Sequence, residues 1–240
     1  MNRNVLKIIA CISMLTDHIG YVLFPDVAAL RLIGRIAMPI FAFFIGEGCL
    51  YTKNRKKYFL RVFILGLICQ SVYVAESIIT GSDGWGYMNI LLTFSLSIIA
   101  CSACLYYKEK RKTEGRERFI SFAVWVSSVI FLLALELFCR NSRDIIGAEI
   151  TIDYGILGMF LPVFVVMNKS RSYKLAGFSA ALLILGYNFY GPDARLLATM
   201  VSVPLLILYN GKPGKKNLKY FFYLFYPLHL AVIYGISIFI

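Results

Sequence analysis

Ionisable side chains inside apolar stretches are the first sign of chemistry in this chain. Asp17 and His18 stand side by side in MLTDHIGYVLF, and the other histidine, His229, lies in FFYLFYPLHLAVIYGISIF. Arg35 follows in LRLIGRIAMPIF. Charge is costly in apolar surroundings, and histidine is the side chain best suited to accept a proton near neutral pH. These residues are therefore candidates for acid–base chemistry in an apolar protein.

The composition explains why the surroundings are apolar. Of 240 residues, 59% are hydrophobic and 16% are charged, whereas a soluble domain is nearer half apolar and a quarter charged. Apolar stretches long enough to cross a bilayer core of about 30 Å recur along the chain, and no run of short alternating strands is present. We therefore expect an all-α, polytopic membrane bundle that forms one domain over residues 1–240.

The apolar stretches predict nine transmembrane helices. Their expected ranges are 5–24, 30–50, 58–79, 87–107, 118–138, 153–167, 172–190, 194–209 and 219–239. The first follows Arg3 and Lys7 without a small-residue cleavage site, so it is expected to be a retained helix rather than a cleaved signal.

Positive charge predicts the orientation of these helices. The N-terminus and every second connection together carry 20 of the 25 Lys and Arg residues. By the positive-inside rule the N-terminus is cytoplasmic and the C-terminus external. The net charge of +12 is then a signal of topology, spread over short inner connections, and we expect no nucleic-acid partner.

Asp17 and Arg35 are predicted to form an ion pair. They lie at similar depths on antiparallel neighbouring helices, and each lowers the desolvation cost of the other. His18 stands at the same level, about 10 Å below the outer surface. Pro39 removes the hydrogen-bond partner of the Arg35 carbonyl, so a kink is expected beside His18. The alternative is a structural clamp between the two helices with no chemistry.

His229 is expected about halfway down the last helix, just after Pro227, which bends it. Tyr226 and His229 are three residues apart and share a helix face. Two alternatives stay open for His229: a role in catalysis, or a hydrogen bond between helices.

Other polar residues have weaker signals. Glu47 stands between two glycines at the inner end of its helix, where it can either pair with a basic residue of the following loop or take part in a site. Asn89 and Asp153 open helices at the outer face, where each can bind a substrate or simply cap its helix. Cys101 and Cys104 form C-x-x-C within a helical pattern, so we interpret them as small packing residues and expect no metal site.

Several segments resemble those of a known family. They are KIIACISMLTDHIGYVLFP (Lys7–Pro25), LRLIGRIAMPIFAFFIGEG (Leu30–Gly48), YTKNRKKYFLR (Tyr51–Arg61), NILLTF (Asn89–Phe94), DYGILG (Asp153–Gly158) and KYFFYLFYPLHL (Lys219–Leu230). In content and order they resemble the TraX family, which is named for the F-pilin acetylase. The resemblance implies a membrane acyltransferase of the bacterial inner membrane. It would move an acetyl group from acetyl-CoA to an acceptor, which for the family's namesake is the N-terminus of processed pilin.

Acetyl transfer would need cations for the donor, a base and an oxyanion site. The second connection carries a cluster of cations that suits the phosphates of acetyl-CoA, with Glu47 beside it: Lys53, Arg55, Lys56, Lys57 and Arg61. His18 is the preferred base, His229 is expected near the thioester, and Arg35 or Tyr226 can donate to the oxyanion. The acceptor, a peptide N-terminus or a small amine, would enter from outside past Asn89 and Asp153.

Two other classes of function fit the same features. Broken helices with buried charges also occur in small-molecule or ion transporters, although no repeat relates two halves of this chain. A non-catalytic assembly factor for surface peptides is the third hypothesis.

Overall fold

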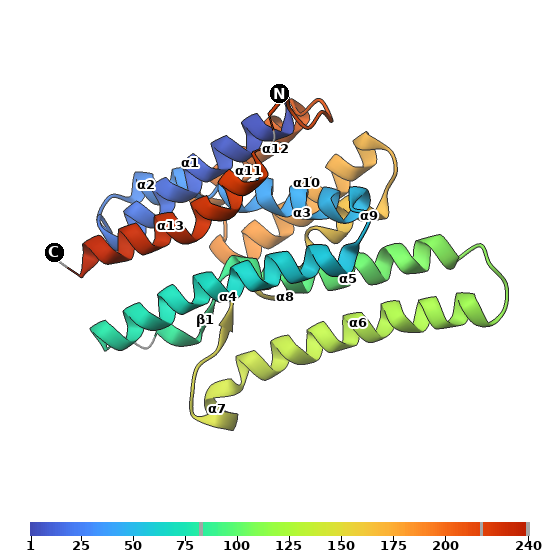
Figure 1. The fold of residues 1–240 in the computed structure, drawn as a ribbon, viewed down its shortest axis with the longest axis horizontal. Helices are drawn as coiled ribbons and strands as arrows, with labels where there is room; N and C mark the ends of the chain where they lie inside the picture. The colour runs from blue at the N-terminus through green and yellow to red at the C-terminus, as the bar shows by residue number, and fades with distance from the viewer. Residues whose placement is uncertain (82–83, 217, 239–240) are drawn as a thin grey trace.

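The protein folds as a bundle of helices (Figure 1). The computed structural model describes residues 1–81, 84–216 and 218–238. The helices are α1 (Arg3–Val22), α2 (Ala28–Gly34), α3 (Ala37–Tyr51), α4 (Arg55–Thr80), α5 (Ile90–Lys110), α6 (Arg116–Arg140), α7 (Ser142–Ile146), α8 (Gly155–Phe160), α9 (Val163–Met167), α10 (Arg171–Tyr190), α11 (Ala194–Met200), α12 (Ser202–Ile207) and α13 (Lys219–Ser237). A 3₁₀ turn, η1 (Gly84–Gly86), and two short parallel strands, β1 (Tyr87–Met88) and β2 (Thr151–Ile152), complete the described elements.

Six helical segments are long and apolar enough to cross a membrane, which indicates a multi-pass membrane protein. They are Arg3–Val22, Ala28–Tyr51, Arg55–Thr80, Ile90–Lys110, Arg116–Arg140 and Tyr220–Ser237. Two shorter apolar segments, Gly155–Met167 and Ala194–Ile207, and the 20-residue α10 occupy the other three predicted ranges. The all-α class is confirmed apart from the two short strands, and the count of nine spans stays a prediction. The last predicted range ends at residue 239, outside the described residues.

Three of the predicted helices are broken in two. The breaks separate α2 from α3, α8 from α9 and α11 from α12. Pro39, Pro162 and Pro204 each lie at or just inside the start of the second piece, where a missing N–H costs no helical hydrogen bond. The kink expected at Pro39 is thus a break at Arg35–Ile36, on the N-terminal side of the proline.

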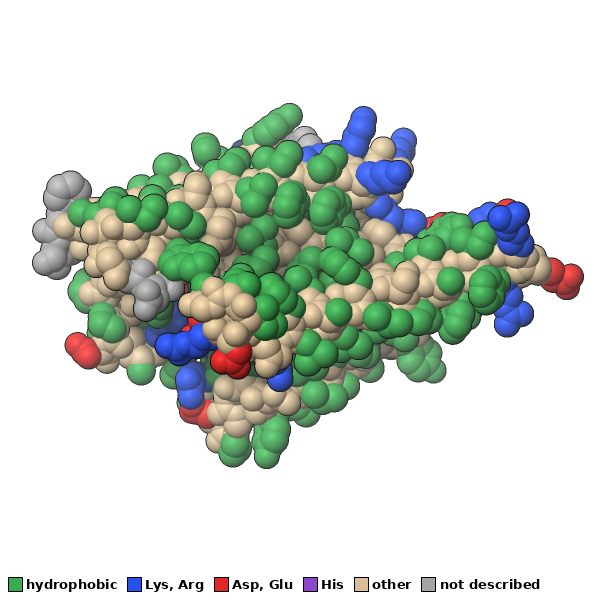
Figure 2. Space-filling view, turned by 90° about the horizontal axis from the view of Figure 1, so that it is seen from below, with side chains coloured by type: hydrophobic (Ala, Val, Ile, Leu, Met, Phe, Trp, Pro, Cys, Tyr) green, Lys and Arg blue, Asp and Glu red, His purple; other side chains and the backbone are tan. Residues whose placement is uncertain are grey.

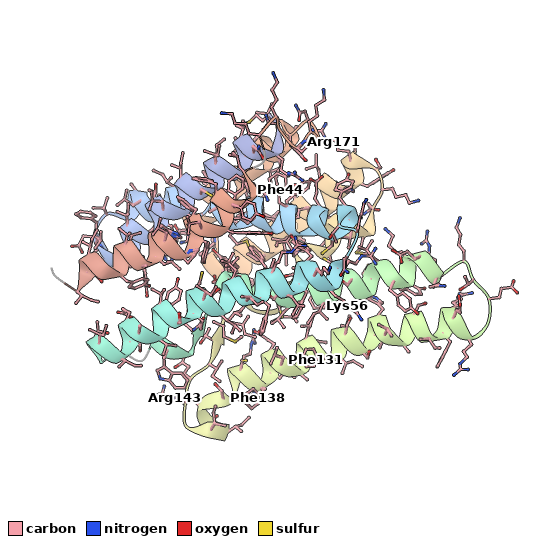
Figure 3. All side chains as sticks on the ribbon, in the orientation of Figure 1. Phe44, Lys56, Phe131, Phe138, Arg143 and Arg171 are labelled. Carbon is pink, nitrogen blue, oxygen red and sulfur yellow. The ribbon has the colours of Figure 1, made fainter. Side chains whose placement is uncertain are left out.

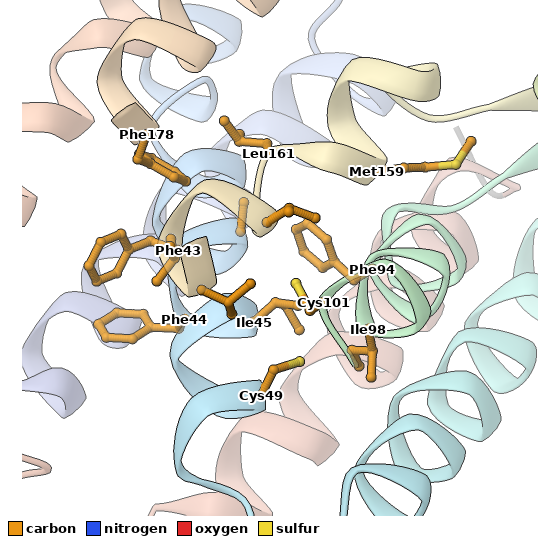
Figure 4. Packing of buried hydrophobic residues seen from close by; sticks show 14 of the residues in the cluster. Phe43, Phe44, Ile45, Cys49, Phe94, Ile98, Cys101, Met159, Leu161 and Phe178 are labelled. Carbon is orange, nitrogen blue, oxygen red and sulfur yellow. The ribbon is translucent and has the colours of Figure 1, made fainter. Parts of the chain in front are cut away.

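The core forms where α3, α5, α9 and α10 meet (Figure 4). Phe43 of α3 packs edge-on against Phe178 of α10, with ring centroids 5.5 Å apart. Cys101 and Cys104 are free thiols buried in this core, where they pack as small side chains. The other four cysteines are also free and buried. Among the six candidate spans, α5 has the largest buried share, so it lies at the centre of the bundle and the other helices pack around it.

Basic residues gather at one end of the bundle. The hairpin of α5 and α6 projects beyond the other helices there, and its tip is charged (Figures 1 and 2). The Nζ atom of Lys108 donates to the carbonyls of Val166 and Met167, at 2.6 and 2.8 Å. This contact caps the free carbonyls at the C-terminal end of α9 and anchors the hairpin.

The first and last helices lie side by side and run in the same direction (Figure 1). Backbone and side-chain hydrogen bonds tie the start of α1 to the connection before α13. Arg3 N donates to the Lys212 carbonyl at 2.9 Å, and Asn4 Nδ2 donates to the Lys216 carbonyl at 2.7 Å. This arrangement brings residues from both ends of the chain to one site.

Candidate active site

A cavity of about 590 Å³ lies between α1, α2, α3, α4 and α13. Five of the residues singled out in the sequence line it: Asp17, His18, Arg35, Asp153 and Tyr226. Tyr21 near the end of α1, Glu76 near the end of α4 and Gly84 in the following turn also line it. All three belong to the end of the bundle that lacks the basic connections. The cavity is therefore on the side predicted to be external.

The predicted ion pair between Asp17 and Arg35 is present, and a second arginine joins it. Asp17 Oδ1 accepts from Arg35 Nη2, and Asp17 Oδ2 accepts from Arg31 Nη1 at 2.7 Å. Arg31 and Arg35 are four residues apart and therefore share a face of the α2 segment. That spacing was the available signal for Arg31, which the sequence analysis missed.

Arg35 is held by more than its carboxylate partner. Its Nη1 donates to the hydroxyl of Tyr190 at 2.9 Å and to that of Tyr154 at 3.3 Å, and its Nε donates to the Arg31 carbonyl at 3.1 Å. Only 11% of the Arg35 side chain is exposed. The guanidinium is thus fixed at the cavity wall by groups from three parts of the fold.

Small and hydroxylated residues make the approach of α1 to α2 possible. A Cβ on Gly34 would overlap the Asp17 carboxylate, so only glycine allows this contact. Where α2 ends, Ser13 Oγ donates to the carbonyls of Ile33 and Gly34, at 2.6 and 3.2 Å. Ser13 therefore satisfies polar backbone groups that the helix break leaves free.

The two histidines are in direct contact. His229 Nε2 lies 3.1 Å from His18 Nδ1, and the ring centroids are 5.0 Å apart. His229 Nδ1 lies 2.9 Å from the Phe225 carbonyl, which can only accept, so this nitrogen carries the hydrogen. In the neutral ring, His229 Nε2 is then an acceptor, and His18 Nδ1 must donate to it.

The same reasoning assigns the remaining nitrogen of His18. Its Nδ1–H is shared between His229 Nε2 and the Met14 carbonyl, which is 3.0 Å away. Nε2 of neutral His18 therefore has a free lone pair, and it makes no hydrogen bond with the described part of the chain. Because His18 lines the cavity, this nitrogen is suited to take a proton from a bound molecule.

His18 and His229 were expected at different depths, but the structure places them in contact. Counting residues from the helix ends placed His229 deeper than His18 by about a quarter of the membrane, yet the two rings touch. The bond between Asn4 and Lys216 shows why, since α13 begins further into the bundle than α1 does. His229 is also not among the described residues lining the cavity, so it stands behind His18 rather than beside the cavity.

Tyr226 connects the histidine pair to the cavity. Its ring meets that of His229 edge-on, with centroids 5.3 Å apart, and only 7% of the residue is exposed. The predicted shared face of Tyr226 and His229 is thus confirmed. Tyr226 belongs to a wider tyrosine lining that the sequence analysis missed because its members come from separate elements and connections: Tyr21, Tyr73, Tyr87, Tyr154, Tyr226 and Tyr234.

The DYG segment supplies a second carboxylate through an unusual backbone. Asp153 N donates to the Met88 carbonyl at 3.2 Å, extending the pairing of β1 with β2. Tyr154 has φ 57°, the left-handed conformation that non-glycine residues rarely adopt. This local strain turns the Tyr154 side chain toward Arg35, while Asp153 lines the cavity.

Like His229, the predicted residues Asn89 and Glu47 do not line the cavity. Asn89 caps α5 by accepting from Leu91 N at 3.0 Å, and its Nδ2 donates to Gly66 O and Gln70 Oε1 at 2.9 Å each, so it joins α5 to α4. The capping alternative therefore describes it. Glu47 accepts from the Tyr209 hydroxyl at 3.0 Å and forms no ion pair with the described residues, so the alternative of an ion pair is not seen there.

The predicted donor cluster lies at the basic end of the bundle, away from the cavity. Lys53, Arg55, Lys56, Lys57 and Arg61 occupy the turn before α4 and its first turns. Within it, Arg55 is paired with Glu109 of α5 at 2.6 Å. Across the described ranges, no group of three or more His, Cys, Asp or Glu side chains is arranged to hold a metal ion.

Comparison with known proteins gives relatives of similar length. The chain is 26% identical over 274 residues to the "Probable fimbrial assembly protein FimC, serogroup H1" of Dichelobacter nodosus, with both chains fully covered. It is 44% identical over 223 residues to an uncharacterized protein of Rickettsia prowazekii (strain Madrid E), covering 86% of this chain and 77% of that one. No solved structure matches the chain.

The family assignment rests on nearly the whole chain. The sequence profile described as TraX protein matches residues 2–237, and therefore includes every cavity residue described above. The chain belongs to the TraX protein family.

Proposed function

We propose that this protein is a membrane-embedded N-acetyltransferase that uses acetyl-CoA. The observation that carries the proposal is the His18–His229 pair, which leaves His18 Nε2 free at a cavity that also contains the fixed guanidinium of Arg35. Membership of the TraX family, whose namesake is the F-pilin acetylase, supports acetyl transfer as the reaction.

His18 would act as the general base. The bound ammonium first loses one proton to external water. His18 Nε2 then accepts the second proton while the neutral amine nitrogen attacks the thioester carbonyl carbon. His18 Nδ1–H remains donated to His229 Nε2, so the positive charge formed on His18 is stabilised by a neutral acceptor. His229 is then a positioning residue that fixes the tautomer and orientation of His18.

The tetrahedral intermediate carries a negative charge on the former carbonyl oxygen. Arg35 and the hydroxyls of Tyr154 and Tyr226 are donors in the same cavity lining as His18, and Arg35 is held in place by Asp17 and Tyr190. Donors that are already fixed cost little reorganisation when this charge develops. Collapse of the intermediate breaks the carbon–sulfur bond, and the departing CoA thiolate takes the proton from His18.

The acceptor is proposed to be a cationic amine that arrives from the external side. Glu76 and Asp153 line the cavity and form no ion pair with the described residues, whereas Asp17 is matched by two arginines. Carboxylates and tyrosine ring faces both attract an ammonium group. A peptide N-terminus or a small amine fits this lining, and pilin-like peptides are the first acceptors to examine.

The donor is proposed to bind from the cytoplasmic side, where the basic connections lie. Lys53, Lys57 and Arg61 are cations at that end that can meet the phosphates of acetyl-CoA. The acetyl group would then have to cross from the cytoplasmic end of α1 toward its external end to reach His18, which is about 22 Å from Arg3 along the helix.

The test is acetyl transfer by the purified protein in proteoliposomes. Radiolabelled acetyl-CoA is supplied on the side of the basic connections and a peptide with a free N-terminus on the other side. Labelled peptide should form with wild type and not with His18→Gln. Absence of transfer by a folded wild-type protein, with every peptide and small amine tried, would refute the proposal.

A second candidate function has one observation in its favour. The Dichelobacter nodosus relative carries a name that describes fimbrial assembly rather than catalysis. If this chain were a non-catalytic assembly factor, the peptide would bind in the cavity but acetyl-CoA would not be consumed. A transporter would instead move an amine across the liposome membrane without modifying it.

A further inference from the structure

A second hollow lies between α4 and α6, with α5 as its floor. Its volume is about 860 Å³, and its walls include Phe59 and Leu60 of α4 and Val124 and Phe131 of α6. Figure 3 shows Lys56 near the start of α4 and Phe131 midway along α6. The described residues that line this groove are different from those that line the active-site cavity, so the groove is a separate feature.

Small side chains create the groove. Ser102 and Ala103 of α5 and Ser128 of α6 line it at positions where a larger residue would fill the space. The hydroxyls donate to their own helices: Ser102 Oγ to the Ile98 carbonyl at 2.6 Å and Ser128 Oγ to the Trp125 carbonyl at 2.7 Å. With these groups already satisfied, the groove presents an apolar surface.

The groove faces the bilayer. Within the apolar stretch of α4 and within that of α6, 22% of the residues are buried inside the protein, against 61% for α5. α4 and α6 therefore expose most of their length to lipid, and an occupant of the groove must come from the apolar phase.

The end of the groove at the basic side carries a positive charge. Arg55 and Lys56 line it there, in the first turn of α4. Arg55 is balanced by Glu109, whereas Lys56 is exposed and forms no ion pair with the described residues. Lys56 is thus available to an anionic group in the first turn of α4, at the depth expected for lipid headgroups.

We propose that this groove binds one anionic phospholipid from the leaflet on the basic side. One of its acyl chains lies between α4 and α6, and its phosphate contacts Lys56. The lipid fills the space that the small residues of α5 leave and so holds the projecting α5–α6 hairpin against α4. Lys56 would then serve a structural lipid and not the acetyl-CoA site.

The proposal is tested by photo-crosslinking in nanodiscs with trace phosphatidylglycerol or phosphatidylcholine that carries a photoreactive group on one acyl chain. Captured lipid is mapped by mass spectrometry of the digested protein. Phosphatidylglycerol should be captured in preference, on the peptides of α5 and α6 that contain Ser102 and Phe131. Equal capture of the two lipids, or crosslinks concentrated on α1 and α13 or on a second copy of the chain, would overturn the proposal.

Two variants sharpen the result. Lys56→Glu should lower phosphatidylglycerol capture about fivefold, while Lys112→Glu, the same charge change on the exposed hairpin tip, should leave it unchanged. Ala103→Leu should reduce capture of both lipids by filling the groove. Equal losses in the two Lys variants, or full capture by a folded Ala103→Leu protein, would contradict the proposal. So would a raised KM for acetyl-CoA in Lys56→Glu with lipid capture unchanged, which would return Lys56 to the donor site.

Discussion

His229 accepts a hydrogen bond from His18 across 3.1 Å, and this contact joins residues separated by 211 positions in the chain. His18 Nδ1 is occupied by this contact and by the Met14 carbonyl, and Nε2 has no hydrogen-bond partner among the described residues. The two histidines are therefore expected to respond differently to substitution.

His18→Gln should lower kcat by about 10²–10⁴-fold, because glutamine cannot accept the proton. His229→Gln, whose amide oxygen can still accept from His18, should lose much less activity than His229→Leu. Steady-state kinetics of the three variants, with melting temperature as the folding control, measures the difference. Equal losses for His229→Gln and His229→Leu would mean that the hydrogen bond does not position His18.

The Asp17 cluster should be more sensitive at Arg35 than at Arg31. Arg35→Gln leaves the partly buried Asp17 carboxylate with only Arg31 as an ionic partner, at a cost of about 1.5–3 kcal/mol. Arg31 is 34% exposed, against 11% for Arg35, so Arg31→Gln should cost far less. Thermal unfolding of the variants with Asp17→Asn, arranged as double-mutant cycles, checks this order. Additive losses for Asp17 and Arg35 would show that the two do not interact.

Gly34→Ala should destabilise the α1–α2 contact. The added methyl group would overlap the Asp17 carboxylate, and such overpacking costs about 1–3 kcal/mol. Gly235→Ala in α13 is the matched control, since its added methyl group would meet no atom of another element within 4 Å among the described residues. The measurement is the melting temperature in detergent, which should fall for the first variant only. An unchanged value for Gly34→Ala would mean that α1 and α2 can separate without loss.

Asp153→Asn should weaken binding of the acceptor amine. Loss of a charge-assisted contact is worth about 1.5–3 kcal/mol, so KM for the acceptor should rise about 10–100-fold while KM for acetyl-CoA stays the same. Asp144→Asn, at an exposed position of α7, is the control and should behave as wild type. If the KM of the acceptor does not change, Asp153 has no part in its recognition.

Topology can be tested with reporter fusions. A reporter fused at the C-terminus should respond as external, and one inserted after Lys112 in the α5–α6 connection should respond as cytoplasmic. Because α1 and α13 run in the same direction, a cytoplasmic response at the C-terminus would invert the whole bundle and reverse the side from which the acceptor enters.

The sequence reveals charged residues that are costly to bury within their own apolar stretch. It does not reveal residues such as Tyr190, whose hydrogen-bond partner is distant in the chain. Asp17 and Arg35 were paired correctly, because two charges at one depth on adjacent helices need each other. Tyr190 could not be found, since nothing in its own stretch indicates that its hydroxyl meets Arg35 155 positions away.

The relative depths of residues on neighbouring helices were also beyond what the sequence could predict. Residue counts measure height along a helix from its own start, and they carry no information on where a neighbouring helix starts. The contact of Asn4 with Lys216 sets that offset and lies outside any local pattern. The helix breaks were more accessible, because each has a proline at or just inside the start of its second piece.

The bonds between the start of α1 and the segment before α13 also bear on how the protein is made. α1 leaves the ribosome before every other helix described here, and α13 leaves after them, so His18 lacks its histidine partner until those helices have been made. Until α13 inserts beside it, α1 has α2 and α3 as its main helical neighbours. The Asp17–Arg31–Arg35 cluster closes within the first 35 residues and can pair the Asp17 charge in the meantime. Assembly order would thus keep the proton-accepting site inactive until the bundle is complete.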